Sequence, residues 1–321
     1  MSRQLPDLAW TSKSDAEAPL LGISIVNYFS SESVSRLLDS LRLFAGANKV
    51  RVVVVDNSND YNKREPELLK KSAKAATTAT FQVEVLPAAS NLGYGAGNNM
   101  GMRCLIDRGV KLLWVLNPDT VVSGSASLFL EEIASSTASL WSTCTVEDGK
   151  TSHGFGFINT LTGKSTKRDC EVAAVGKFNM SYPSGHSIVF TREAWESLGG
   201  FDEDYFLFME EADLTLRSLH QGLKIGSLQC VSVHHNQGLT TGSTTNLETK
   251  SLIAFTEATK SRVIFFRKFF PLRIPLLLLS RYVYALKVYC KGNPAGAKGI
   301  VSGITSGLFR QLKDKDRSVG K

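Results

Sequence analysis

The chain has 321 residues, of which 43% are hydrophobic and 21% are charged. This size and composition are ordinary for a globular protein and allow one large α/β domain with an appendage. The five cysteines are scattered without a Cys-x-x-Cys pair, which argues against a disulfide framework and favours reduced thiols in the cytoplasm. The first twenty residues are polar and include Asp7, Lys13 and Glu17, so we expect no signal peptide.

The formal net charge of +7 is concentrated near the C-terminal end. Residues 260–321 contain fourteen Lys and Arg against two Asp, whereas the preceding part of the chain is mildly acidic. The same tail is rich in Leu, Phe and Tyr, and a segment that is both basic and apolar is more typical of a membrane surface than of a nucleic-acid partner. We therefore expect peripheral association with a membrane and no nucleic acid.

The first third of the chain predicts alternating strands and helices. Residues 1–19 are polar, and we expect them to be loosely ordered. Apolar runs predict buried strands at 21–26, 50–55, 81–86 and 112–116, and the segments between them predict helices at 31–43, at 63–76 and after a glycine-rich loop at 91–101, up to about Arg108. This spacing predicts βαβ units, hence an α/β fold with a mainly parallel central sheet and helices on both faces.

The pattern changes after Val121. We expect helices at 125–134, 192–198 and 206–221, strands at 187–191 and 224–233, and an irregular or antiparallel insertion at 140–176. A long helix is expected at 248–270, and Pro271 and Pro275 interrupt it. The predicted organisation is a catalytic domain at 20–247, with a nucleotide-binding half at 20–121 and an acceptor half at 122–247, followed by a basic, apolar helical region at 248–321.

The segment Ile274–Tyr289 is apolar but too short to span a membrane. Its uncharged run, residues 274–280, is far below the roughly 20 residues that a span needs, and Arg281 and Lys287 follow it. We favour an interfacial helix whose basic residues reach the lipid headgroups, and a helix docked on the main domain is the alternative.

Polar residues follow the predicted strands at the edge where open α/β sheets bind ligands. Asn27 and Tyr28 follow the first strand, Asp56 follows the second, and Asp119 follows the fourth, which Pro118 ends. Asp119 can bind a hard divalent cation, Asp56 can accept the imide N–H of a pyrimidine, and Tyr28 can pack near the base. This set suits a nucleoside diphosphate. Alternatively, the two acids only cap turns and Tyr28 belongs to the core.

The glycine-rich stretch Asn91-Leu-Gly-Tyr-Gly-Ala-Gly-Asn-Asn resembles a dinucleotide fingerprint in the wrong place. That fingerprint follows the first strand, whereas this stretch follows the third and has Asn98 at the position of the last glycine. A nicotinamide enzyme is therefore disfavoured. We expect Gly93 and Gly97 to let the backbone pass close to the nucleotide, and we include Asn91, Asn98 and Asn117 in the nucleotide-binding set.

A second acidic stretch places Glu210, Glu211 and Asp213 within four positions, which costs stability unless a partner or a function compensates. Asp213 can pair with Arg217 one turn later, and Glu210 can cap or pair locally. Glu211 then remains as a carboxylate that can take a proton from a hydroxyl. The alternative is a solvated acidic helix start, favoured by the helix dipole.

Two histidines, His234 and His235, end the last predicted strand. A neutral imidazole is a common metal ligand, so either of them can complete a metal site with Asp119. The pair is weak evidence by itself, because one of the two rings can simply be packed.

In this order, these residues resemble the family 2 glycosyltransferases of the GT-A fold, over about Leu21–Gly242. The resemblance rests on four motifs, Val-Val-Asp-Asn-Ser (54–58), Asn-Leu-Gly-Tyr-Gly-Ala-Gly-Asn-Asn (91–99), Leu-Asn-Pro-Asp (116–119) and Gly-Gly-Phe-Asp-Glu-Asp-Tyr-Phe-Leu-Phe-Met-Glu-Glu-Ala-Asp-Leu (199–214). The nearest branch is the bacterial rhamnosyltransferase-like one, which builds O-antigen and other surface glycans. Its membrane-apposed tails are similar to the helices expected after residue 248.

The resemblance implies a role for each matched residue. Asp56 would read the base, Asp119 would be the remaining acid of the Asp-x-Asp metal motif, and Glu211 would be the catalytic base. One histidine would complete the metal site, and we prefer His235 because His-Asn-Gln-Gly (235–238) is similar to the family's His-x-x-Gly. Asn117 replaces the first acid of Asp-x-Asp, which removes one charge from the metal site.

The function that the resemblance implies is an inverting glycosyltransferase that uses Mg2+ or Mn2+. The expected partners are a nucleotide sugar, first dTDP-rhamnose with UDP-linked hexoses or galactofuranose as alternatives, and a glycan or lipid-linked acceptor at the inner face of the cytoplasmic membrane. A nucleotidyltransferase is a rival, but it would carry a basic loop at 27–31, where this chain has no Lys or Arg. A non-catalytic module that binds nucleotide sugars or glycans is another.

Overall fold

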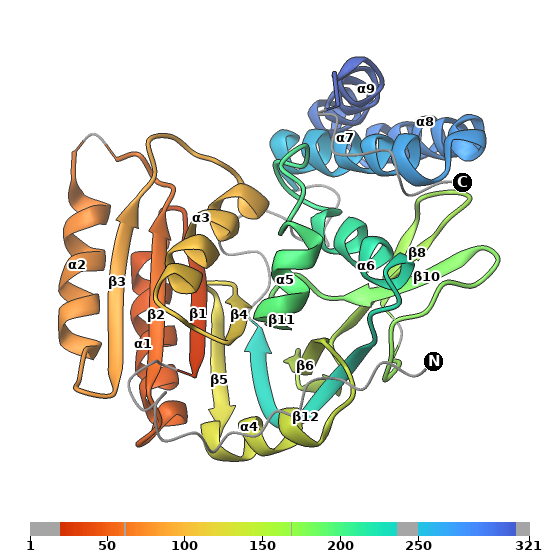
Figure 1. The fold of residues 1–321 in the computed structure, drawn as a ribbon. Helices are drawn as coiled ribbons and strands as arrows, with labels where there is room; N and C mark the ends of the chain where they lie inside the picture. Colours follow the sequence, from red (N-terminus) through yellow and green to blue (C-terminus); the bar gives the residue numbers. More distant parts are fainter. Residues whose placement is uncertain (1–19, 61, 168, 236–249, 313–321) are drawn as a thin grey trace.

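The structure is a computed structural model that describes residues 20–60, 62–167, 169–235 and 250–312. Its central sheet runs in the order β3-β2-β1-β4-β11-β6-β12-β5 (Figure 1). The first four of these strands are parallel, namely β1 (Leu21–Asn27), β2 (Val50–Asp56), β3 (Phe81–Pro87) and β4 (Leu112–Leu116). They match the four predicted apolar runs, because strands covered on both faces need side chains that are apolar throughout.

The other half of the sheet is mixed. It contains β11 (Ser187–Thr191), β6 (Leu140–Glu147), β12 (Ile225–His235), β5 (Thr120–Gly124) and the short β7 (Lys150–Ser152). Strand β11 is antiparallel to β4 and β6, β12 is parallel to β6, and β5 is antiparallel to β12. A smaller antiparallel sheet contains β10 (Asn179–Pro183), β8 (Phe155–Asn159) and β9 (Ser165–Lys167).

Helices cover both faces of the central sheet, as predicted. One core combines the sheet with α1 (Ser31–Ala45), α2 (Arg64–Ala76) and α4 (Ala126–Ser135). The opposite core combines it with α3 (Tyr94–Asp107), α5 (Arg192–Leu198) and α6 (Glu210–His220). The fully buried Trp114 on β4 stacks on Phe129 of α4 at a centroid distance of 5.0 Å, so the centre of the sheet is also the centre of the core.

Three expectations about elements need correction. Residues 140–176 are not only an insertion, because β6 is an internal strand of the main sheet. The glycine-rich stretch is mostly helix, since α3 begins at Tyr94. Helix α6 begins at Glu210 rather than at 206, because Phe208 and Met209 have φ of 70° and 73°, outside helical geometry.

Among the described residues, three helices follow the strands of the main sheet, namely α7 (Leu252–Phe269), α8 (Ile274–Cys290) and α9 (Pro294–Phe309), with a short 3-10 turn at Pro271–Arg273. They lie together near α6 and the β8–β10 hairpin, far from α2 and β3 (Figure 1). Among the described residues, no helix is long and apolar enough to cross a bilayer. The predictions for residues 1–19, for the chain after His235 up to 249 and for 313–321 lie outside the described residues.

Candidate active site

The carboxyl end of the parallel strands carries a buried polar network. The Asp56 Oδ1 accepts hydrogen bonds from Asn27 Nδ2 at 3.1 Å, from the Ser58 amide at 3.1 Å and from Ser58 Oγ at 2.6 Å. Asn27 is fully buried. Its Nδ2 also donates to Glu65 Oε2, and its Oδ1 accepts a hydrogen bond from the backbone N–H of Ser30. The side chain of Asn27 is therefore used by the fold, and its contact with a nucleotide stays a prediction. Asp56 Oδ2 accepts no hydrogen bond from the described residues.

An open pocket of about 380 Å3 lies beside this network. Its lining consists of Tyr28, Phe29, Ser58, Asn59, Asp60, Asn62 and Asn91. The rings of Tyr28 and Phe29 are 42% and 54% exposed, and they meet edge to face with centroids 5.0 Å apart. Exposed aromatic rings with nearby amide and hydroxyl groups suit a planar nucleobase. Asp56 accepts two hydrogen bonds from Ser58, which lines the pocket, so Asp56 helps to shape the pocket.

The glycine-rich stretch packs the fold together. Asn91 Oδ1 accepts the Gly93 amide at 3.0 Å, and Asn57 Nδ2 donates to the Gly93 carbonyl at 3.0 Å. A Cβ on Gly97 would lie 3.0 Å from Val26, and Asn98 is fully buried, with its Oδ1 accepting from Ser24 Oγ at 2.9 Å. Gly97 and Asn98 thus hold α3 against β1, and their part in nucleotide binding stays a prediction.

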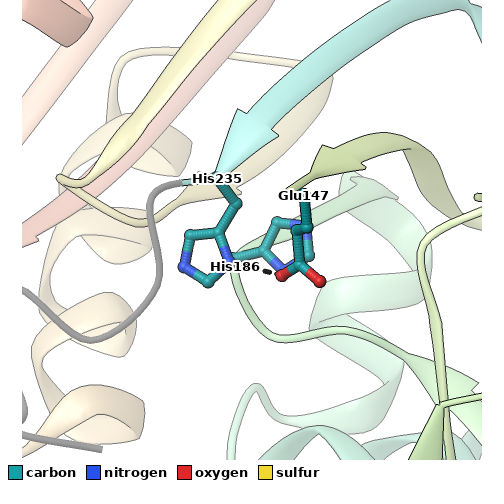
Figure 2. Close-up of side chains that lie close together, drawn as sticks. All are labelled: Glu147, His186 and His235. Atoms are coloured by element: carbon teal, nitrogen blue, oxygen red, sulfur yellow. Dashed lines mark hydrogen bonds and ion pairs between the residues drawn. The ribbon is translucent and has the colours of Figure 1, made fainter. Parts of the chain in front are cut away.

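A second cluster lies where β4, β6 and β12 end. The His235 ring lies between two carboxylates, with Nδ1 2.7 Å from Glu147 Oε1 and Nε2 3.5 Å from Asp119 Oδ1. The buried His186 ring stacks on His235 at 4.5 Å with an angle of 10° between the rings, and its Nε2 is 2.9 Å from Thr145 Oγ1. Figure 2 shows Glu147, His186 and His235 together, with ligand atoms within 4.8 Å of one another.

This cluster fits a divalent cation. Asp119 Oδ1 is buried and accepts no hydrogen bond from the described residues, which is costly for a carboxylate oxygen without another partner. Glu147 binds Nδ1 of His235, so Nε2 is the nitrogen left to face Asp119. A carboxylate that fixes the second nitrogen of a metal-binding histidine is a recurring arrangement in metal sites. Asp119 and His235 are thus the residues that would hold the ion.

The two carboxylates favour a positive charge at this place, and a bound ion would replace the Nε2 proton of His235. Burial by itself lowers the pKa of His235, but the contacts with Asp119 and Glu147 and the charges of both carboxylates raise it to about 9. His234 lies on the other side of the strand, exposed, with its Nε2 3.4 Å from Ser123 Oγ. Side chains alternate along a strand, so only His235 can approach Asp119.

The predicted base lies at the start of α6. Burial raises the pKa of Glu211 to about 7, and the positive charge of Arg262 limits that rise. The neighbouring Glu210 is 2% exposed, and its Oε2 has no hydrogen-bond partner among the described residues. Burial and then the charge of Glu211 raise the pKa of Glu210 well above its usual value. Glu211 is therefore the carboxylate able to gain and lose a proton near neutral pH.

One turn connects the two carboxylate sites. A Cβ on Gly185 would lie 3.9 Å from Glu211 Oε2, and the Gly185 carbonyl accepts a hydrogen bond from the Tyr94 hydroxyl. The next residue is His186, which stacks on His235 beside Asp119. Glu211 and Asp119 therefore lie on two sides of the turn at 184–186 and not on opposite surfaces of the molecule.

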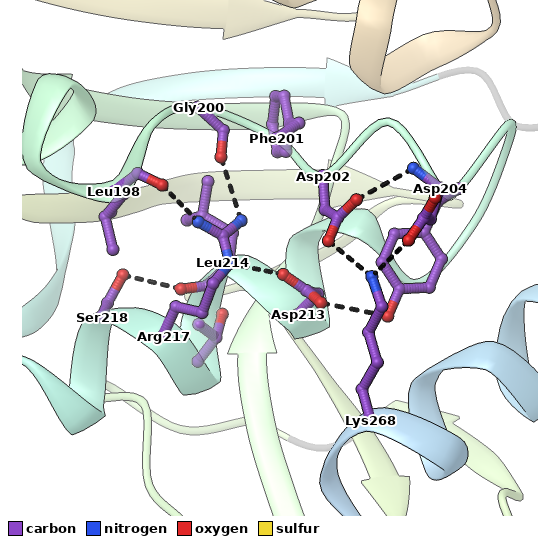
Figure 3. Close-up of polar contacts among 12 residues, drawn as sticks. Leu198, Gly200, Phe201, Asp202, Asp204, Asp213, Leu214, Arg217, Ser218 and Lys268 are labelled. Carbon is purple, nitrogen blue, oxygen red and sulfur yellow. Dashed lines mark hydrogen bonds and ion pairs between the residues drawn. The ribbon is translucent and has the colours of Figure 1, made fainter. Parts of the chain in front are cut away.

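Asp213 and Arg217 form the predicted one-turn pair and have a structural position. Arg217 Nε donates to Asp213 Oδ1 at 2.5 Å, and its Nη atoms donate to the carbonyls of Leu198 and Gly200 (Figure 3). The Tyr205 hydroxyl donates to Asp213 Oδ2 at 3.0 Å. The pair thus ties α6 to the end of α5, and the supporting role expected on the acceptor side stays a prediction.

Sequence reasoning missed Glu147 and His186. Glu147 ends β6, which had no readable strand pattern, and His186 precedes β11 in the short stretch Ser184-Gly-His. The signal that would have found Glu147 is its place at the end of an internal strand, the same signal that pointed to Asp119. Asn117 follows the end of β4, where its backbone N–H donates a hydrogen bond to the His186 carbonyl at 3.0 Å.

No family model matches the chain, but the chain is similar to known proteins both in sequence and in structure. The chain is 23% identical over 231 residues to the low-salt glycan biosynthesis hexosyltransferase Agl10 of Haloferax volcanii, which covers 68% of this chain and 67% of that protein. The structure of the present chain is similar to that of the mannosyltransferase PcManGT from Pyrobaculum calidifontis in complex with GDP-Man and Mn2+. The TM-score is 0.53 at 11% identity, over 91% of this chain and 88% of that one.

The structural similarity confirms the predicted α/β architecture as a GT-A-like fold. Membership of family 2 and of the rhamnosyltransferase-like branch stay predictions, as do the individual site residues. Together, the two similarities support a glycosyltransferase.

Proposed function

We propose that the protein is an inverting glycosyltransferase that moves a sugar from a nucleotide-sugar donor to an acceptor hydroxyl, with Glu211 as the general base. The observation that carries this proposal is the position of Glu211, whose pKa is about 7, across the turn at 184–186 from Asp119 and His235. A base poised near neutral pH on one side and a site for a diphosphate on the other are what an in-line displacement needs.

In the proposed reaction, Glu211 accepts the proton of the acceptor hydroxyl while that oxygen attacks the anomeric carbon of the donor. A bond forms between this oxygen and the anomeric carbon, and the bond from the anomeric carbon to the diphosphate breaks, with its electron pair leaving on the diphosphate. Asp119 and His235 would hold a Mg2+ or Mn2+ ion, with Glu147 orienting His235. Such an ion would offset the negative charge that develops on the departing diphosphate.

The donor is a nucleotide sugar whose base lies in the pocket between Tyr28 and Asn91. Two lines favour different sugars. The motifs in the sequence favour dTDP-rhamnose, whereas the names of the two similar proteins favour a hexose donor such as GDP-mannose. We place the hexose first, because a whole-chain similarity in fold and a separate similarity in sequence both point to it.

The acceptor in this proposal is a glycan on a lipid carrier, presented at a membrane surface. Helix α8 supports this, because its Leu276, Leu279, Val283 and Leu286 are 50–64% exposed on one face. The exposed Lys287 and Lys291 lie at its C-terminal end, and residues 258–312 contain no Asp or Glu. An apolar face with basic residues beside it suits an anionic lipid surface at the inner face of the cytoplasmic membrane.

The proposal is tested with Glu211→Gln and a donor panel of dTDP-rhamnose, GDP-mannose, UDP-linked hexoses and UDP-galactofuranose. We expect one donor to raise the melting temperature with Mn2+ and the variant to keep that shift, while its transfer rate falls by about 10^2–10^4-fold, the usual contribution of a general base. Glu193→Gln, an exposed acid on α5, is the matched control. Unchanged transfer by Glu211→Gln would show that the base is another residue, and a panel without any binding donor would contradict the activity itself.

A further inference from the structure

Beyond the metal cluster, the C-terminal helical region contains a group of cations. Arg262 of α7, Arg281 of α8 and Lys250, just before α7, act on one another electrostatically, with Arg262 as the common neighbour. Arg281 is only 7% exposed, and Arg262 and Lys250 are partly buried. Cations of one sign are seldom gathered and buried without an anion to compensate them.

Both arginines converge on the turn between β8 and β9. Arg262 Nε donates to the Gly163 carbonyl at 2.9 Å, and its Nη2 donates to Ser165 Oγ at 3.0 Å. Arg281 Nη2 lies 3.5 Å from the Thr162 carbonyl, so residues from two helices and one hairpin meet here. The hydrogen-bond acceptors in this group are neutral, and none of the three cations has an ion pair with a described carboxylate.

One donor in the group is left over. Arg281 Nε is buried and has no hydrogen-bond partner among the described residues. Burial, followed by the charge of Arg262, lowers the pKa of Arg281 to about 10 and also lowers the pKa of Lys250. An unpaired donor and mutual repulsion are both relieved by an anion that binds to the group.

The group adjoins the proposed base. Ser165 Oγ accepts a hydrogen bond from Arg262 and is also hydrogen-bonded to the hydroxyl of Tyr182. Tyr182 and Arg262 both interact electrostatically with Glu211. The path from Glu211 through Tyr182 to Arg262 runs along β10 and the hairpin turn. These cations share no residue with the metal cluster of Asp119 and His235 or with the lining of the pocket beside Tyr28, where we place the donor.

We infer that Lys250, Arg262 and Arg281 form a binding site for a phosphate-type anion carried by the acceptor, such as the phosphate or diphosphate that links a glycan to a lipid. The assignment of this anion to an acceptor rests on the proposed function as a glycosyltransferase. The three cations would hold the anion while Glu211, on the near side, receives the proton from the hydroxyl. Two arginines and a lysine offer the fork and point-charge geometry that phosphate groups prefer.

The test is calorimetric titration of the full chain with geranyl phosphate and with geraniol, in buffer that contains EDTA, so that no metal ion binds the phosphate. We expect the phosphate to bind at least about tenfold more tightly than the alcohol, as charge-assisted hydrogen bonds provide. Lys250→Gln and Arg281→Gln should each lower the affinity for geranyl phosphate about tenfold. Lys74→Gln, an exposed lysine on α2, should leave it unchanged.

Equal affinity for the two ligands would overturn the inference, and so would wild-type affinity in Lys250→Gln, whose partly exposed side chain can be changed without loss of the fold. A second titration with Mn2+ and a saturating nucleoside diphosphate separates two sources of the anion. Undiminished binding of geranyl phosphate supports an acceptor site, whereas displacement assigns the cations to the donor and overturns it. Since no transfer is measured, these results are independent of the Glu211→Gln experiment.

Discussion

At the scale of single residues, the metal cluster depends on how one imidazole is held. His235 lies between Glu147 and Asp119, at 2.7 and 3.5 Å, so each of its nitrogens has a different task. Glu147 accepts the proton of Nδ1, so Nε2, which faces Asp119, is the nitrogen that would bind the ion after it loses its own proton. The buried Asp119 Oδ1, which lies 3.5 Å from Nε2 and has no hydrogen bond among the described residues, would be the second ligand atom.

Truncation of the supporting carboxylate should weaken metal binding without removal of a ligand. We expect Glu147→Ala to lower the Mn2+ affinity by about 10- to 100-fold, the usual effect of losing such a partner, when Mn2+ binding is followed by calorimetry. His235→Ala should lower it further. His234→Ala is the matched control and should bind Mn2+ as the wild type does; an equal loss in His234→Ala would refute the choice between the two histidines.

The sequence predicted the residues of this site that stand at the end of a readable element. Asp119 and His235 follow apolar strands, and Glu211 stands in a recognisable acidic motif. Glu147 and His186 were missed because β6 carries the polar Ser142, Thr143 and Thr145. These are buried only because Ser142 Oγ donates to the His153 carbonyl and Thr143 Oγ1 to Ser187 Oγ. Such partners, distant in the chain, cannot be read from a local pattern.

At the scale of elements, the paired helices α7 and α9 show how closely the C-terminal region is packed. Gly299, Gly303 and Gly307 of α9 recur every fourth residue and face α7. A Cβ on Gly303 would lie 2.5 Å from the Thr256 carbonyl oxygen, which belongs to the backbone and cannot move aside. Lys268 of α7 also contacts Asp202 and Asp204, at 2.5 and 3.1 Å (Figure 3), so these helices belong to the fold.

This close packing predicts an inverted effect of alanine. In an ordinary exposed helix, Gly→Ala gains about 1 kcal/mol from helix propensity. We expect Gly303→Ala to lose about 1–3 kcal/mol instead, because the added methyl group forces the helices apart. Ser302→Ala, on the exposed face of the same turn, should be neutral or slightly stabilising. Urea unfolding measures both, and a more stable Gly303→Ala would contradict the packing.

The elements most accurately predicted were those whose periodicity is strong, such as β1, β2, β4 and α5 with its left-handed Gly199 cap. The start of α6 was not, because Phe208 and Met209 adopt positive φ without being glycines. Such strained backbone persists where the surrounding structure imposes it, here directly before Glu210 and Glu211. Local propensity carries no sign of it.

At the scale of the whole molecule, α8 has two apolar faces. Leu277, Ala285 and Val288 pack inward, while Leu279 and Leu286 are 63% and 64% exposed. The docked helix and the interfacial helix weighed from the sequence are thus compatible, since one face docks and the other is open to a partner.

We expect the protein to float with vesicles of phosphatidylglycerol and less with neutral phosphatidylcholine, because basic residues add electrostatic attraction to apolar insertion. Leu279→Ser with Leu286→Ser should lower vesicle binding several-fold. Leu43→Ser is the control, because Leu43 is 77% exposed on α1, on another part of the surface. Vesicle binding that is equal in all three proteins would argue for another partner of this face.

In the proposed reaction centre, residues from both halves of the sheet act together, with Glu211 as the base. Tyr94 and Tyr182 face Glu211 and stay neutral near pH 7, because burial raises the pKa of both above 10, and the charge of Arg262 is constant there. Glu211 must be ionised to accept a proton, and its pKa is raised to about 7, so activity should be lost as the pH falls through 7 and should be full above it.

The most direct measurement is the pH dependence of kcat/KM for sugar transfer between pH 5.5 and 9 with Mn2+, because kcat/KM reports the pKa of the base before the substrates bind. The account predicts a rise of one proton with a midpoint near 7 in the wild type, and a low rate without this rise in Glu211→Gln. A wild-type rate that is flat over the whole range, or a Glu211→Gln variant that keeps the same rise, would contradict it.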